Sequence, residues 1–297
     1  MLRSLYSGVS GMRGFQTKMD VIANNIANVN TTAFKASRVS FQDMLSQTTA
    51  NASSPSANGL GGINAKQIGL GVKVGSIDMM MGGGALQPTN RELDFAIENE
   101  GFFAVSSDVT IDDPTAAILD GATVGTISYT RDGAFFRDYE GNLVNASGQR
   151  VLGYLENAGT VIEDDTDIAI DPESLERESL QPLKIAETND DGAKLQSFSI
   201  DTSGQIIAVY SDGETATTTF LGQIGIVRFS NPAGLTKTGG NNYKESNNSG
   251  LPQFGQAGSN GFGTINQGFL EMSNVDLANE FTEMIIASSA YQANSRS

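Results

Sequence analysis

The sequence contains no cysteine, no histidine and no tryptophan among its 297 residues. Without cysteine, disulfides, thiolate catalysis and cysteine-ligated zinc are excluded. Without histidine, the chain lacks the commonest general base and the commonest metal ligand, so a Ser-His-Asp triad is impossible. These absences remove several classes of enzyme. They leave the compartment open, because a secreted protein can also lack cysteine.

Basic residues are scarce as well. The chain has 18 Lys and Arg against 34 Asp and Glu, which gives a net charge of −16. Nucleic acid is therefore not expected as a partner, because phosphate binding needs a basic surface. No apolar run approaches the roughly 20 residues that span a bilayer, so we expect no membrane insertion. Charged residues interrupt positions 1–26, and we expect no cleaved signal peptide there.

Both ends of the chain predict amphipathic helices. Apolar residues recur there at steps of three and four, which places them along one stripe of a helix. Such a stripe must be buried, so two of them indicate ends that pack against each other and against copies of the same chain. We predict helix packing and polymerisation through Leu2, Leu5, Val9, Met12, Phe15, Met19, Ile22 and Ile26, and through Leu277, Phe281, Met284 and Tyr291.

The two predicted helices differ in their local signals. The first, over residues 4–29, contains Gly8, Gly11 and Gly14, each of which costs about 1 kcal/mol relative to alanine. These glycines are either plain imperfections or positions where another helix approaches closely. The second helix is predicted over residues 274–294. Ser273 as the N-cap and Asp276 three residues later form a capping box at its start. Isolated helices of this length are marginal in water, so we expect both to fold on polymerisation.

The long middle of the chain predicts an antiparallel β domain, because short apolar segments alternate with turn sequences such as SDG at 211–213. The predicted fold class is therefore mainly β, with an antiparallel β domain carried on a coiled-coil-like stem of paired terminal α-helices. The predicted domains are a helical polymerisation domain at 1–32 and 273–297, a flexible linker or extended connector at 33–85, and an acidic β domain at 86–272 with residues 156–197 as an insertion.

Two patterns offer alternatives to a purely structural chain. The acidic run at 163–167, with Asp171 nearby, resembles a calcium loop but lacks the glycine and the closing glutamate of that motif, which favours a solvated acidic loop. Paired carboxylates of a secreted carbohydrate-active β enzyme would be invisible in sequence, because they pair only in space. We assign no catalytic, metal-binding or cofactor-binding residue and expect no enzyme.

Three segments resemble the rod and hook proteins that form the axis of the bacterial flagellum. The N-terminal signature of this family is matched by ANNIANVNTTAFK at 23–35, its C-terminal signature by GFLEMSNVDL at 268–277, and its shared core by LQPTNRELDFAI at 86–97. The resemblance covers essentially the whole chain. It departs from the family at Ala33, where glycine is usual, so the turn there is expected to differ.

The resemblance implies a structural subunit of the flagellar hook, with the distal rod of the basal body as the alternative. Hook subunits leave the cell unfolded through the flagellar export apparatus and polymerise into a flexible tube that transmits torque from rod to filament. The implied partners are copies of the same chain, the rod and hook–filament junction proteins, the hook cap and the export apparatus, and the implied location is extracellular. Phe41 and Leu45 match a short element that engages the export gate, although an ordinary strand explains them equally well.

Overall fold

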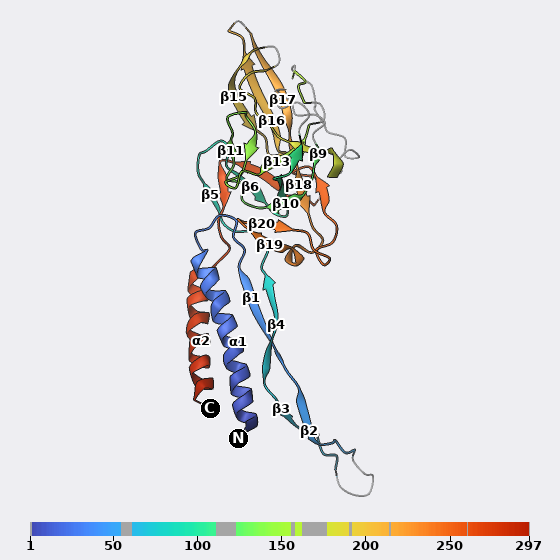
Figure 1. The fold of residues 1–297 in the computed structure, drawn as a ribbon, viewed down its shortest axis with the longest axis vertical. Coiled ribbons are helices and arrows are strands. Elements are labelled where there is room, and N and C mark those ends of the chain that lie inside the picture. Colours follow the sequence, from blue (N-terminus) through green and yellow to red (C-terminus); the bar gives the residue numbers. More distant parts are fainter. Residues whose placement is uncertain are drawn as a thin grey trace. The chain divides into compact units, whose positions relative to one another are not determined.

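The computed structural model describes residues 2–54, 61–110, 123–155, 158–161, 177–189, 192–213, 215–259 and 261–296. The chain divides into two compact units (Figure 1). Unit 1 comprises Met1–Asn30, Lys35–Met80 and Val275–Ser297, and unit 2 comprises Thr31–Phe34 and Met81–Asn274. The predicted fold class is confirmed, because the described strands pair antiparallel and a helix lies at each end of the chain.

Unit 1 contains two helices and two β ribbons. Helix α1 spans Leu2–Ala27 and α2 spans Leu277–Ser295. Strand β1 (Ser37–Asp43) pairs with β4 (Val72–Met79), and β2 (Ser46–Ala50) pairs with β3 (Lys66–Gly69). The segment 33–85, predicted as a flexible linker or extended connector, thus contains four strands. Composition suggested a linker because the side chains of β2 and β3 are all exposed, so their sequence carries no apolar alternation.

The start of α2 differs from the prediction. The N-cap is Asp276, not Ser273, and its carboxylate accepts hydrogen bonds from the backbone N–H groups of Ala278 and Asn279. Aspartate is as good an N-cap as serine, and its negative charge also suits the positive end of the helix dipole. The capping box predicted from Ser273 is therefore wrong, and the helix begins three residues later than predicted.

Unit 2 is a β domain built mainly around one large sheet. The path of strands through this sheet is β15-β16-β17-β13-β7-β10-β20-β19, with neighbours hydrogen-bonded. The strands of the unit are β5 (Leu86–Pro88), β6 (Phe95–Glu98), β7 (Phe102–Ser106), β8 (Val109–Thr110), β9 (Thr123–Val124), β10 (Ile127–Thr130), β11 (Phe136–Arg137), β12 (Leu143–Val144), β13 (Arg150–Tyr154), β14 (Leu180–Pro182), β15 (Lys194–Ile200), β16 (Gln205–Ser211), β17 (Ala216–Ile224), β18 (Ile226–Arg228), β19 (Thr236–Gly239), β20 (Asn242–Lys244), β21 (Gln253–Gly255), β22 (Thr264–Gln267) and β23 (Phe269–Glu271), and two 3-10 helices are η2 (Arg177–Ser179) and η3 (Pro232–Gly234).

Strand β7 lies at the centre of unit 2. All five of its side chains are buried, and it pairs with β10, β13 and β18. Phe103 stacks edge-on against Phe135 with ring centroids 5.2 Å apart. A strand buried on both faces reads as a continuous apolar run, which is why the sequence FFAV at 102–105 has no alternation.

The segment predicted as an insertion, 156–197, is in part integral to the core. Strand β14 pairs with β13, and Leu180, Leu183 and Ile185 are buried. From residue 180 onward the prediction of an insertion is therefore wrong. The acidic residues at 162–176 lie outside the described residues, and so does the calcium-like run within them.

Unit 2 is expected to lose stability at high pH because it contains two buried tyrosines, Tyr129 and Tyr243. Burial raises the pKa of both Tyr129 and Tyr243 to about 12. In the unfolded chain a tyrosine titrates near ~10, so the folded state binds these protons more tightly. Their stabilising effect is complete below pH ~10 and is lost as the pH rises towards 12. For each tyrosine, we expect the free energy of unfolding of unit 2 to fall by on the order of 2 kcal/mol between pH ~10 and 12. Unfolding in urea at a series of pH values measures this; a stability independent of pH over that range would contradict it.

Candidate functional site

The two helices of unit 1 pack antiparallel along one side of α1. Lys18 forms an ion pair with Glu283 at 3.0 Å, and Asn25 donates a hydrogen bond to Glu280 at 3.1 Å. A Cβ on Gly11 would lie 2.6 Å from the side-chain nitrogen of Asn294, so a larger residue there would displace that amide. Gly11 thus lies where the side chain of Asn294 approaches the backbone of α1 closely.

Partial burial between the two helices makes the Glu280 carboxyl harder to ionise. Desolvation raises the pKa of the Glu280 carboxyl, and the hydrogen bond from Asn25 partly opposes the shift. A raised pKa favours the protonated acid in the folded state. The contribution of Glu280 to the helix pair is therefore greatest at low pH and falls as the pH rises through its pKa.

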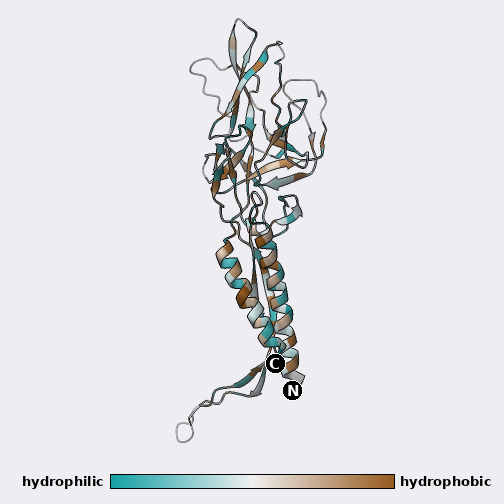
Figure 2. Cartoon of the chain, turned by 90° about the vertical axis from the view of Figure 1, so that its left-hand side faces the viewer, coloured by the Kyte–Doolittle hydropathy of each residue, from teal (hydrophilic) through white to brown (hydrophobic). Residues whose placement is uncertain are grey.

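The side of α2 that faces away from α1, which we call the outer face of α2, is apolar, exposed and uncharged. Leu277, Phe281 and Ile285 follow one another at steps of four, with 39 %, 50 % and 67 % of their surfaces exposed, and Ile286 is 58 % exposed beside them. The acidic residues of the helix, Glu280 and Glu283, turn instead towards α1. Figure 2 shows brown, hydrophobic stretches on the helices. Contiguous exposed apolar surface of this kind marks an interaction site in a soluble protein.

The side chains predicted for polymerisation differ in how far they are buried. Ile22 is buried, and Leu5, Leu277 and Phe281 are exposed. The half-buried ones are Val9, Met12, Phe15, Met19, Ile26, Met284 and Tyr291. The side chain of Leu2 lies outside the described ones. The buried residues of α1 are Gly11, Gly14, Ile22 and Asn25, and of these only Ile22 belongs to the predicted set.

The β1–β4 ribbon packs on α1. The rings of Phe15 and Phe41 lie 5.5 Å apart, and the Ser10 hydroxyl accepts a hydrogen bond from the Val72 N–H at 3.3 Å. Of the two residues predicted for export-gate binding, Phe41 is thus half-buried in β1, whereas Leu45 lies between β1 and β2 and is exposed.

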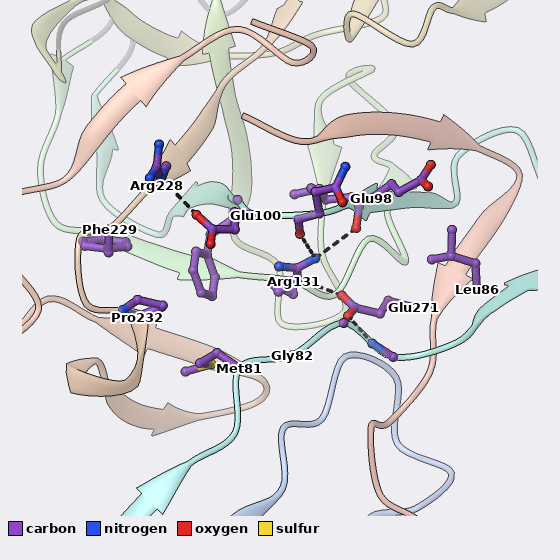
Figure 3. Close-up of a pocket in the computed structure, with 16 residues that line it drawn as sticks. Met81, Gly82, Leu86, Glu98, Glu100, Arg131, Arg228, Phe229, Pro232 and Glu271 are labelled. Carbon is purple, nitrogen blue, oxygen red and sulfur yellow. Dashed lines mark hydrogen bonds and ion pairs between the residues drawn. The ribbon is translucent and has the colours of Figure 1, made fainter. Parts of the chain in front are cut away.

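A buried ion pair lies within unit 2, which the sequence prediction missed. Arg131 Nε donates to Glu271 Oε2 at 2.8 Å, and both side chains are almost fully buried. The same guanidinium donates to the carbonyls of Ile97 and Asn99. Beside it opens a cavity of about 570 Å³, where Arg228 pairs with the more exposed Glu100 (Figure 3).

Glu271 joins three segments that are distant in sequence. Its other carboxylate oxygen accepts from the Gly84 N–H at 2.8 Å, and its backbone carbonyl accepts from the Ala33 N–H at 2.8 Å. A Cβ on Gly84 would overlap the Met272 carbonyl, so glycine is required for this approach. These segments, 31–34, 81–84 and 271–274, are the parts of unit 2 where the chain passes from or to unit 1. We call the arrangement the Glu271 clamp.

Ala33, within this clamp, has a left-handed backbone. Its φ is +55°, in the region that favours glycine, and its side chain is buried. A non-glycine residue pays about 1–2 kcal/mol for this conformation. The hydrogen bond of its N–H to Glu271 holds the turn in place, so the alanine keeps a conformation that suits glycine better.

The two units differ sharply in charge. Unit 1 carries eight basic and six acidic residues, a net charge of +2, whereas unit 2 carries 10 basic and 28 acidic residues, a net charge of −18. Among the described residues, no group of three or more acidic side chains is placed to hold a metal ion. Neither described helix is long and apolar enough to cross a membrane. Unit 1 is thus the weakly basic part of the chain, and unit 2 is the strongly acidic part.

Models of three flagellar families match the chain. The model described as flagella basal body rod protein matches residues 5–35, and that of the flagellar hook protein FlgE/F/G D1 domain matches residues 119–208. The flagellar basal body rod FlgEFG protein C-terminal model matches residues 266–297. Most of α1, all of α2 and part of the β domain thus fall within matched ranges.

Individual relatives cover the whole chain. It is 46% identical over 297 residues to the flagellar basal-body rod protein FlgG of Bacillus subtilis, covering 100% of this chain and 94% of the relative. It is 29% identical to the flagellar hook protein FlgE of Borreliella burgdorferi over 445 positions, covering 100% and 96%. A solved structure, Helicobacter pylori flagellar hook protein FlgE2, matches 35% of this chain and 22% of its own at 27% identity, with a TM-score of 0.23.

Proposed function

Because this chain belongs to the family of flagellar rod and hook proteins, we propose that it is a structural subunit of the distal rod that polymerises through its terminal helices. The family is a structural one, and the proposed role is mechanical rather than catalytic. The observation that carries the proposal is the exposed, uncharged apolar face of α2, formed by Leu277, Phe281, Ile285 and Ile286. A face of that kind is expected to be covered by another chain.

Two observations favour the rod over the hook, which the sequence resemblance alone had placed first. The alignment with the rod relative from Bacillus subtilis runs over 297 residues, the length of this chain, at 46% identity. The alignment with the hook relative from Borreliella burgdorferi runs over 445 positions although this chain has 297 residues, and identity falls to 29%. The hook relative therefore carries a large portion that has no counterpart here.

The proposal includes partners and a route of export. The subunit associates with copies of itself and with neighbouring rod and hook components, and it forms part of the axial structure outside the cytoplasm. It leaves the cell through the flagellar export apparatus without a cleaved signal, and Phe41 and Leu45 engage the export gate while the chain is unfolded. In the folded subunit Phe41 is occupied by its contact with Phe15, so this engagement precedes folding.

The shape of the assembled polymer tests the proposal. We expect the purified full chain to form straight tubes by electron microscopy, and a chain without residues 1–32 to remain monomeric. Circular dichroism before and after assembly reports whether further helix forms on polymerisation. Curved tubes would favour the hook instead, and a full chain that stays monomeric at every concentration and ionic strength tried would contradict polymerisation altogether.

A further inference from the structure

Unit 1 has a second unoccupied apolar surface besides the outer face of α2. A groove of about 420 Å³ lies between α1 and the β1–β4 ribbon. Val9 of α1 and Val72 and Val74 of β4 line it, together with Met44 and Leu70. The outer face of α2 has the shape that such a groove accepts, because apolar side chains at steps of four form one ridge along a helix.

A copy cannot fill this groove with its own α2. Helix α2 contacts α1 through Gly11, Lys18 and Asn25, which recur at intervals of seven. The groove uses Tyr6 and Arg13, which recur at the same interval. Positions 11 and 13 are two residues apart, which is about 200° around a helix. The groove, which Ser10 and Gly14 extend towards Gly11, and the bound α2 therefore lie on different flanks of α1.

The charges of the two surfaces are complementary. Two cations line the groove, Arg13 and Lys73, no carboxylate does, and neither cation forms an ion pair with any described residue. The segment Val275–Ser297 has three acidic residues and one basic residue, a net charge of −2. The remainder of unit 1 has seven basic and three acidic residues, a net charge of +4. Opposite net charges steer such surfaces together.

We propose that the outer face of α2 in one copy docks into the groove between α1 and the β1–β4 ribbon of a neighbouring copy. Leu277, Phe281 and Ile285 are the anchors that enter the groove. Because the two surfaces differ, the contact is head-to-tail, and a head-to-tail contact whose rotation does not close generates an open helical polymer. This inference rests on the proposed polymerising function and adds the contact that performs it.

The absence of cysteine from the chain allows a direct test. Full-length copies carrying Val74→Cys in the groove are mixed with copies carrying Ile285→Cys on α2, under assembling conditions and mild oxidation. The matched control replaces the second copy by one carrying Tyr139→Cys, a residue of unit 2 that is 90% exposed. We expect disulfide-linked heterodimers of the first pair to form at least ~10-fold faster than those of the control, because docking raises the effective concentration of the two thiols.

The outcomes separate the docking contact from the proposed function. If tubes form while the first pair crosslinks no faster than the control, the docking contact is wrong and polymerisation stands. If the first pair crosslinks rapidly but only short oligomers form, the docking contact stands and the tube-forming function is contradicted. A mixture that neither crosslinks above the control nor assembles contradicts both.

Discussion

Replacing Glu271 with alanine is expected to destabilise unit 2 by about 3–5 kcal/mol, because Arg131 then remains buried without its counter-charge. The two side chains are about 4% and 1% exposed, so water does not replace the lost partner. The substitution also leaves the Gly84 N–H without its carboxylate acceptor. Urea unfolding of the monomer, followed by tyrosine fluorescence, measures the loss, since five of the seven tyrosines lie in unit 2.

A matched control for this substitution lies at the same cavity. Glu100 pairs with Arg228 at 3.1 Å, but the two side chains are 69% and 37% exposed. The Glu100→Ala variant is expected to cost no more than about 1 kcal/mol, because exposed ion pairs contribute little. Equal losses from the two variants would show that burial does not set the strength of the Glu271 clamp.

Replacing both Phe281 and Ile285 with serine is expected to block assembly while leaving the monomer folded. Both side chains point away from α1 and are at least half exposed in the monomer, so little packing is lost there. Burial of the exposed half to two thirds of such a side chain in a contact between copies contributes about 1–2 kcal/mol. The critical concentration for assembly is therefore expected to rise roughly 5- to 30-fold for each residue replaced.

Sedimentation of the assembled fraction across a range of protein concentrations measures this effect. The control is Leu251→Ser in unit 2, which removes an apolar side chain that is 85% exposed and lies outside the helices. Circular dichroism of the monomers establishes that the variants keep their helix content. If the double variant assembles at the same concentration as the Leu251 variant, the outer face of α2 is not part of the contact between copies.

Periodicity in the sequence was sufficient to find both helices but not the faces they bury. The predicted first helix, 4–29, differs from α1 (Leu2–Ala27) by only two residues at each end. The side that packs on α2 carries Gly11, Lys18 and Asn25, which a search for apolar residues passes over. Lys18 finds its partner at Glu283, so only the folded chain reveals this pairing.

The Glu271 clamp could not be predicted from the sequence either. Arg131 and Glu271 are separated by 140 positions, and each looks like an ordinary charged residue of a turn or strand end. At Ala33 we predicted a turn different from the one that glycine forms, whereas its φ of +55° lies in the region that favours glycine. The pairing of β2 with β3, within the predicted linker or extended connector, could not be seen in the sequence, because backbone hydrogen bonds leave no mark in the side-chain pattern.

The confinement of negative charge to unit 2 has a consequence for completed tubes. Two tubes drifting together would present 18 excess negative charges per β domain wherever those domains meet. At physiological ionic strength this repulsion reaches only about 8 Å, which is enough to oppose close contact between the β domains of neighbouring tubes. High salt screens this repulsion, so it is expected to make assembled tubes associate side by side without changing their length.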